Sequence, residues 1–311
     1  MNAKAKGYVL GAVAAATYGM NPLFALPLYE AGMDPDSVLF FRYLFAIPLL
    51  GVMLRARGRR LGVSRRQLPV LIAMGLLVAL SSLALFQSYN YMDAGIASTL
   101  LFVYPVMVAL MMAVVCKEKP SVQTVVCILL VSVGIGLLYK GSDGATLSPV
   151  GMILVFVSSF SYALYIVGVN RTSLKDMATL KVAFYVLLFG LSLFVVRLGM
   201  NGGLHLPGQW YLWGNLLALA VFPTAVSFVC TTGAIRYIGS TPTAILGALE
   251  PVTAVVFGIT VFGETLTLRE GIGLATIVAA VSGVVAGERM AVWTVRLRKL
   301  FPKVPVGNRR K

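Results

Sequence analysis

Glu250 is the residue with the clearest potential for chemistry, because it lies in the middle of an otherwise apolar run. The stretch AILGALEPVTAVVFG, residues 244–258, holds this one carboxylate, and Pro251 follows it directly. An ionised carboxylate at the centre of a membrane helix costs about 2.5–3.5 kcal/mol on insertion scales. Pro251 cannot donate to the carbonyl of Gly247, so we expect that carbonyl to be unpaired. Broken helices are tolerated where they line a cavity or meet neighbouring helices, which predicts a polar, inward-facing patch.

Three interpretations of Glu250 remain open. The carboxyl could load and release a proton as the site alternates, which would make a proton gradient a partner. It could instead bind an ammonium group, with tyrosines forming an aromatic cage, since cations bind ring faces. The candidate cage residues are Tyr18, Tyr89, Tyr104, Tyr162 and Tyr165. Finally, a permanently protonated Glu250 could be hydrogen-bonded into the bundle for packing alone.

Arg42 is a second ionisable group inside an apolar run. It lies about six residues, roughly 9 Å, from the start of that run at 1.5 Å per residue. Its long side chain could extend outward to the interface or pair with a carboxylate. A structural anchor is the preferred interpretation of such an arginine near a helix end, and a substrate ligand is the alternative.

Two amide side chains also lie in apolar runs. Asn21 precedes Pro22 in a run that Pro22 and Pro27 are expected to kink. Its amide could bind substrate or satisfy the carbonyls that the kink frees. Gln87 shares its run with Ser81, Ser82 and Ser88, which make this run too polar for a lipid-facing helix. These side chains could line a pathway or hydrogen-bond neighbouring helices.

The elements that position these side chains must be membrane helices. Hydrophobic residues make up 59% of the 311, charged residues 12%, and the mean hydropathy is +0.88. A soluble globular domain carries about 25% charged residues. Apolar stretches of about 20 residues, the length that crosses a hydrocarbon core of roughly 30 Å, recur along the chain. The composition therefore predicts an all-α, polytopic protein in a lipid bilayer.

The pattern predicts ten transmembrane helices with short connections. They are residues 7–28, 37–54, 68–89, 94–115, 121–139, 149–169, 178–196, 211–233, 240–262 and 272–286. In the first, Gly7, Gly11, Ala15 and Gly19 are spaced by four and form a smooth stripe that predicts close helix packing.

Lysine and arginine positions predict the orientation. The chain holds 26 Lys and Arg against 11 Asp and Glu. With the N-terminus inside, 22 of the basic residues fall in cytoplasmic segments, including a basic tail at 288–311, and three fall outside. This positive-inside distribution predicts that both termini are cytoplasmic. Basic residues confined to such segments argue for topology signals and lipid anchors and against a nucleic-acid partner.

The two halves of the chain repeat each other. VYPVMVALMMAVVCKEKPS, residues 103–121, aligns with LEPVTAVVFGITVFGETLT, residues 249–267, at an offset of 146. Pro105 then meets Pro251, and Glu118 meets Glu264, where each glutamate is expected to cap a helix start. We predict two five-helix repeats, at 1–141 and 148–287, the second inverted because five is odd. Inverted repeats place a substrate site near the midplane between the halves and permit alternating access, which indicates a transporter.

The chain resembles the EamA-like ten-helix members of the drug/metabolite transporter superfamily over nearly its whole length. The strongest resemblance is RYIGSTPTAILGALEPVTAVVFGITVFGETLTLREGIGLATIVAAVSGVV, from residue 236. NYMDAGIAS at 90–98, FRYLFA at 41–46, YGMNP at 18–22 and SYALYIV at 161–167 are similar to further family motifs. The last two carry Tyr18 and Tyr162 at positions where relatives have tryptophan, and Pro22 stands for phenylalanine.

The resemblance implies transport of a small metabolite, an amino acid or a related compound, across the bacterial inner membrane, with export as the expected direction. A transporter of cationic or quaternary amines recognised by Glu250 and the tyrosines is the alternative. The resemblance argues against a role for Glu250 in substrate specificity, because relatives with unlike substrates share Leu-Glu-Pro.

Other classes of protein are disfavoured by missing features. His205 is the only histidine and lies in a predicted outer connection, so no multi-histidine metal site is expected. An intramembrane enzyme is a remote alternative, since we find no nucleophile and base motif and no glycine-rich phosphate loop. Rings of like side chains, which a channel needs, do not stand out. We predict no cofactor, no metal and no catalytic residue.

Overall fold

The computed structural model describes residues 2–58, 61–92, 97, 100–115, 117, 122–138, 148–200, 203–262, 268–269 and 271–280. Every regular element within these ranges is a helix, as the predicted all-α fold class requires. Glu118, Glu264 and the basic tail at 288–311 lie outside the described residues, so the predictions for them stay predictions.

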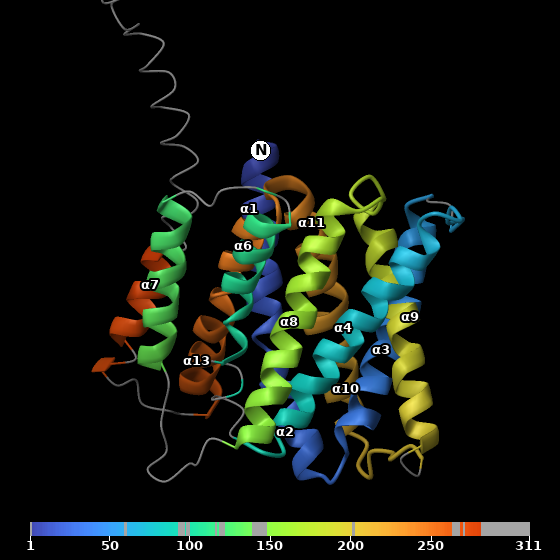
Figure 1. Ribbon diagram of the computed structural model, residues 1–311. Coiled ribbons are helices and arrows are strands. Elements are labelled where there is room, and N and C mark those ends of the chain that lie inside the picture. Colours follow the sequence, from blue (N-terminus) through green and yellow to red (C-terminus); the bar gives the residue numbers. More distant parts are fainter. Residues whose placement is uncertain are drawn as a thin grey trace, which may run out of the picture.

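The described helices follow one another in a single bundle (Figure 1). They are α1 (Ala3–Tyr18), α2 (Asn21–Glu30), α3 (Pro35–Ala56), α4 (Leu68–Ser88), α6 (Tyr104–Val114), α7 (Val122–Leu138), α8 (Pro149–Arg171), α9 (Thr179–Met200), α10 (Leu212–Ala220), the π-helical turn η1 (Val221–Val226), α11 (Ser227–Ile238), α12 (Ser240–Leu246) and α13 (Leu249–Phe262). A further short helix covers Gly271–Ala280.

Six helical stretches of the described residues are long and apolar enough to cross a membrane. They are Ala3–Glu30, Pro35–Ala56, Leu68–Ser88, Pro149–Arg171, Thr179–Met200 and Leu212–Ile238. Each coincides with one of the predicted spans. Shorter apolar helices at Tyr104–Val114, Thr124–Leu137 and Gly271–Ala280 lie inside three more. The polytopic membrane architecture is confirmed, while the count of ten stays a prediction.

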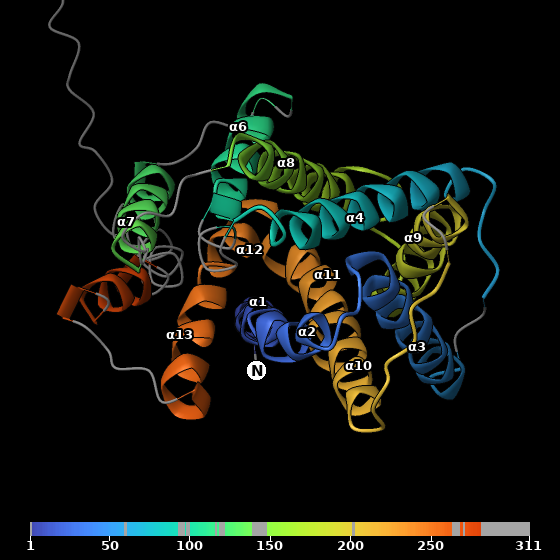
Figure 2. The ribbon, with the colours of Figure 1, turned by 90° about the horizontal axis from the view of Figure 1, so that it is seen from below.

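Packing is most extensive between α1 and α11 and between α4 and its neighbours α8 and α9. Figure 2 shows α1 and α2 between α13 on one side and α10 and α11 on the other. The small-residue stripe faces α11, α12 and α13, because a Cβ added to Gly7, Gly11 or Gly19 would lie within 2.7 Å of Tyr237, Leu246 or the Glu250 carbonyl oxygen, respectively. The predicted close packing is therefore present.

Serine and tyrosine hydroxyls connect α4 to other helices. Ser81 and Ser158 hydroxyl oxygens lie 3.1 Å apart, between α4 and α8, and Tyr43 on α3 reaches Ser82 at 3.1 Å. These contacts match the second of the two roles predicted for the polar content of this span, that of linking helices.

Three helices are interrupted near the middle of the bundle. Turns at Gly19–Met20, Phe102–Val103 and Gly247–Ala248 precede α2, α6 and α13. The predicted spans 7–28 and 240–262, in which a kink and a broken helix were expected, are each divided into two helices. The prediction of an unpaired Gly247 carbonyl is wrong, because the N–H of Glu250 donates to it at 2.8 Å.

Charged side chains join the start of α3 to the end of α9 and to the segment that follows it. Arg197 Nε donates to Asp36 Oδ1 at 2.7 Å and Nη2 donates to Oδ2 at 3.0 Å, a two-point contact. Asp34 caps α3 by accepting from the Ser37 N–H at 3.1 Å, and His205 Nδ1 lies 2.8 Å from its Oδ1. Burial opposes ionisation of Asp34, but the hydrogen bonds from Ser37 and His205 outweigh it and lower the pKa of the carboxyl.

Candidate functional site

Glu250 lies in the first turn of α13, directly after the interruption at Gly247–Ala248. The residue is 8% exposed. The close packing of α1 against α13 helps to bury it, since a Cβ on Gly19 would come within 2.5 Å of the Glu250 carbonyl oxygen. No lysine or arginine of the described residues forms an ion pair with it. The sequence therefore places a buried carboxyl, without a cationic partner in this part of the chain, where three interrupted helices meet.

A cavity of about 40 Å³ opens beside Glu250. Its lining comes from all three interruptions and from α4: Tyr18, Gly19, Asn21, Pro22, Leu85, Tyr89, Leu101, Phe102, Glu250 and Pro251. Roughly 10–15 Å³ is enough for one water molecule, so this cavity can hold water or a small polar group. Most of this lining is apolar, so Glu250 faces inward as predicted, but its surroundings are polar only at Asn21 and the two tyrosines.

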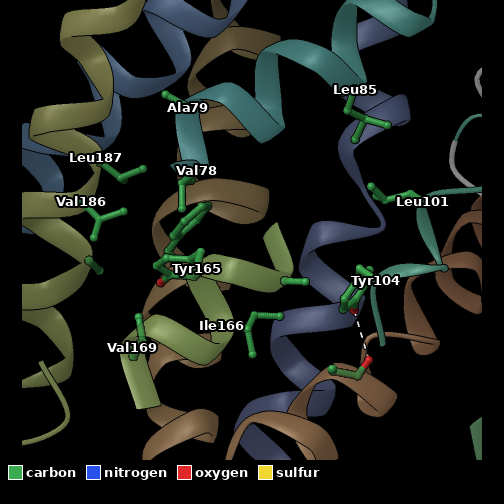
Figure 3. Close-up of a cluster of buried hydrophobic side chains, with 14 of the residues drawn as sticks. Val78, Ala79, Leu85, Leu101, Tyr104, Tyr165, Ile166, Val169, Val186 and Leu187 are labelled. Carbon is green, nitrogen blue, oxygen red and sulfur yellow. Dashed lines mark hydrogen bonds between the residues drawn. The ribbon is translucent and has the colours of Figure 1, made fainter. Parts of the chain in front are cut away.

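A second, smaller cavity of about 10 Å³ also has Glu250 in its wall. It is bordered by Tyr104, Tyr162, Thr231 and Gly247, together with residues of α1. Figure 3 shows Tyr104 directed toward the chain before α13, and its hydroxyl donates to the Ala244 carbonyl at 3.2 Å. Glu250 is thus shared by two cavities, with Tyr18 bordering one and Tyr104 and Tyr162 the other.

Four of the predicted cage tyrosines form one continuous ring cluster. Tyr18 and Tyr162 stack with centroids 6.4 Å apart, and Tyr104 meets Tyr162 edge-on at 5.1 Å. Tyr165 stacks on Tyr162 at 6.1 Å, but its hydroxyl is 3.1 Å from that of Thr232 and it lines neither cavity. Tyr165 therefore packs against Tyr162 on the side away from the cavities, while Tyr18, Tyr104 and Tyr162 border the two cavities that Glu250 shares.

Gln87 lies apart from the site, near the end of α4. Its Oε1 accepts from the Asn90 amide at 3.4 Å, and it borders neither cavity. The structure brings together the predicted residues Glu250, Tyr18, Tyr104, Tyr162 and Asn21, but not Gln87.

Arg42 is fully buried, so the predicted extension to the interface is wrong. Its Nε donates to the Thr224 hydroxyl and its Nη2 to the Pro223 carbonyl at 3.2 Å. The guanidinium faces the rings of Tyr18 and Phe86, 5.8 Å and 5.5 Å from their centroids. Among the described residues no carboxylate pairs with it, contrary to the predicted alternative of an acidic partner.

The π-helical turn η1 supplies the acceptors that hold Arg42. Pro223 has no N–H and cannot donate to the carbonyl of Leu219, four residues earlier. The Thr224 hydroxyl donates to that carbonyl instead, at 2.8 Å, and accepts from Arg42 Nε. π-helical turns are rare and occur frequently at functional sites. Pro223 within an apolar run is the signal from which this turn could have been suspected.

Asn21 begins α2 and is 3% exposed. Both polar atoms of its amide are buried without a hydrogen-bond partner. It therefore satisfies no backbone carbonyl, which was one of its two predicted roles. Tyr29, which the sequence analysis did not single out, also has a buried hydroxyl without a partner.

Comparisons with known proteins agree with this architecture. The sequence model of the EamA-like transporter family matches residues 5–140 and 149–286. An uncharacterized transporter of Archaeoglobus fulgidus is 32% identical over 81% of this chain and 87% of its own. The uncharacterized transporter YcbK of Bacillus subtilis is 24% identical over 82% and 85% of the two chains. The uncharacterized inner membrane transporter YicL of Salmonella typhimurium is 23% identical over 90% and 95%.

A solved crystal structure has the same fold. It superposes with a TM-score of 0.77 and covers 92% of this chain and 99% of its own, at 16% identity. The family match extends over most of the chain, and the helical membrane architecture and the buried polar centre are consistent with it. The chain is a membrane protein that belongs to the EamA-like transporter family.

Proposed function

We propose that this protein is a secondary transporter that moves a small metabolite, an amino acid or a related compound, out of the cell across the inner membrane by alternating access. The observation that carries the proposal is the position of Glu250. Its carboxyl is buried where three helix interruptions meet, and both cavities that it borders are lined by polar and aromatic side chains. Intramembrane acids in such positions mark substrate or ion pathways.

The helix packing supports a rocking mechanism between two inverted repeats. When the first five predicted spans are superposed on the last five, the α1–α11 pair corresponds to the α8–α4 pair, and both pairs pack extensively. The α3–α9 pair, whose helices correspond to each other, joins the halves at one side. Such a frame can open alternately to either side of a central site.

A transporter of cationic amines is the second candidate, and the ring cluster favours it. Tyr18, Tyr104 and Tyr162 present aromatic surface beside a carboxyl group, and this combination binds ammonium groups. Both candidate functions use Glu250. They differ in the substrate, because an amino acid carries a carboxylate and a cationic amine does not.

The test measures currents from reconstituted protein on a solid-supported membrane, with a panel of amino acids, quaternary amines and nucleobases. We expect a substrate current that responds to a pH gradient and that is lost in Glu250→Gln. Glu30→Gln is the matched control, because Glu30 is an exposed carboxyl at the end of α2. A substrate that still moves at the native rate through Glu250→Gln would show that this carboxyl is part of the scaffold. A protein that moves nothing in the panel would contradict the proposal.

A further inference from the structure

Three buried groups near the candidate site lack hydrogen-bond partners among the residues that the structure describes. They are the amide of Asn21, the hydroxyl of Tyr29 and Nη1 of Arg42. Folded proteins leave few buried polar groups unpaired, and each such group calls for an explanation. One explanation is a ligand that supplies the missing partner.

The three groups share aromatic neighbours. Arg42 faces the rings of Tyr18 and Phe86. The Tyr29 ring meets Phe86 edge-on at a centroid distance of 6.2 Å. Asn21, three residues after Tyr18, lines with it the cavity of about 40 Å³. Of the three groups, the Asn21 amide lies in the wall of that cavity, which Glu250 also borders. Arg42 and Tyr29 are not part of the lining but contact the rings of Tyr18 and Phe86, and Tyr18 separates Arg42 from the cavity.

The cluster carries a positive charge that no carboxylate of the described residues compensates. Arginine stays protonated in proteins, and Arg42 is held by two neutral acceptors, the Thr224 hydroxyl and the Pro223 carbonyl. A buried cation without a counter-ion is unfavourable. The three unpaired groups all offer N–H or O–H donors. Charge and donor set together fit a carboxylate, which forms strong charge-assisted hydrogen bonds with a guanidinium.

We propose that Arg42, Asn21 and Tyr29 form a subsite for the carboxylate of the transported molecule, whose ammonium group is received by Glu250. This inference rests on the proposed function and narrows its substrate class to zwitterions. Each buried charge then meets the opposite charge on one ligand. The site would discriminate against amines and amides of the same shape, because these leave the guanidinium without a counter-ion.

The test uses matched probes that differ only at the carboxylate: leucine, leucinamide and 3-methylbutylamine, and phenylalanine, phenylalaninamide and 2-phenylethylamine. Currents from reconstituted protein are expected to favour each amino acid by about tenfold to a hundredfold over its two analogues, the range for hydrogen bonds to a charged group. Arg42→Gln is expected to abolish the preference.

Two further variants guard against misfolding of the arginine variant. Tyr29→Phe and Asn21→Leu remove groups that have no partner, so the thermal stability of the empty protein is expected to hold or rise. Each is nevertheless expected to reduce the preference for the carboxylate. Tyr43→Phe is the matched control, since its hydroxyl is paired with Ser82. That variant is expected to lose stability and to keep the preference.

Several outcomes would overturn the inference. Native protein that moves the amines or amides as readily as the amino acids has no carboxylate subsite, although the proposed transport function survives. Full preference in both Tyr29→Phe and Asn21→Leu would show that these groups do not contact the ligand. Native protein that moves none of the six probes would refute the proposal that the substrate is a zwitterion. The wider panel of amino acids, quaternary amines and nucleobases would then test whether the protein is a transporter at all.

Discussion

Tyr104 and Gly247 make the tightest contact beside the candidate site. A Cβ added to Gly247 would lie 1.6 Å from the Tyr104 hydroxyl oxygen, so the hydroxyl occupies the space that a side chain would need. Glycine at residue 247 lets the start of α6, which carries Tyr104, approach the turn that precedes α13 and Glu250. Tyr104 and Gly247 both border the smaller cavity, so the shape of that cavity depends on the absence of a side chain at residue 247.

Gly247→Ala is therefore expected to destabilise the protein by about 1–3 kcal/mol, the usual cost of overpacking, and to reduce transport. Thermal unfolding in detergent and substrate currents measure the two effects. Gly214→Ala on α10 is the control, because nothing lies within 4 Å of its added Cβ. Equal stability of the two alanine variants would contradict the proposed contact.

Asp34 gives a pH dependence whose sign follows from its hydrogen bonds. Its pKa is lowered in the folded protein, so its contribution to stability is present above the unfolded value of about 3.9 and is lost as the pH falls through the folded value. We expect Asp34→Asn to lower the melting temperature at about pH 6 and to have little effect below about pH 3. Asparagine retains the cap on α3. A difference that stays constant over this range would contradict the assignment.

At this scale, the sequence identifies the charged groups but not their partners. Glu250, Arg42 and Asn21 stand out because polar side chains are costly in apolar runs. The partners of Arg42 lie 181 and 182 residues further along the chain, so nothing local in FRYLFA identifies them. Whether a buried group is paired depends on tertiary packing, and Tyr29 was overlooked for the same reason.

At the scale of helices, prolines mark where a new helix begins. α2 and α6 each have proline within the first two positions, and Pro251 is the third residue of α13. Proline is tolerated in the first turn because the N–H that it lacks would have no intrahelical partner there. Pro22 and Pro251 were expected to kink or break a helix, and each instead lies in the first turn of a new one. The Gly247 carbonyl is paired for the same reason: α13 begins just after it, and the N–H of Glu250 in the first turn donates to it.

The Asp36–Arg197 ion pair joins α3 to α9 at one end of the bundle. We expect that opening of the transporter at that end would separate the pair. We expect the neutral double variant Asp36→Asn/Arg197→Gln to increase labelling of a cysteine at Leu28, which is fully buried near this end. A membrane-impermeant maleimide measures this in a background without the native cysteines.

Lys175→Gln is the control for that experiment, because Lys175 is exposed beyond the opposite end of α9. An exposed cysteine introduced at Val150 normalises the labelling. Labelling of the Leu28 cysteine that does not change in the double variant would show that the ion pair does not restrain opening.

At the scale of the whole molecule, composition and periodicity predict the membrane architecture, because a chain in lipid must pair its backbone polar groups internally and a helix does so. The two aligned halves are not equivalent in their polar groups. At the offset of 144, Arg42 corresponds to Val186, and at the offset of 146, Thr224 corresponds to Val78. The repeat predicts the frame, whereas the polar groups within it have to be found residue by residue.

The predicted orientation, with both termini cytoplasmic, rests on the distribution of basic residues over the whole chain. We expect protease tags at both termini to be protected in intact spheroplasts and to be cleaved after lysis. A tag inserted beside His205, in a connection predicted to face outward, is expected to be cleaved without lysis. Cleavage of either terminal tag in intact cells would refute the predicted topology.

The stripe of Gly7, Gly11, Ala15 and Gly19 also has a mechanical consequence. Interlocking side chains resist sliding, because displacement along a helix axis must lift each one out of its hole. Side chains of Ile238 on α11 and Leu246 on α12 occupy the space that a Cβ on Gly7 or Gly11 would need, and the Glu250 carbonyl oxygen on α13 does the same at Gly19. We therefore expect α1 to move together with these helices as one rigid unit, so that a displacement of α1 would carry Glu250 with it.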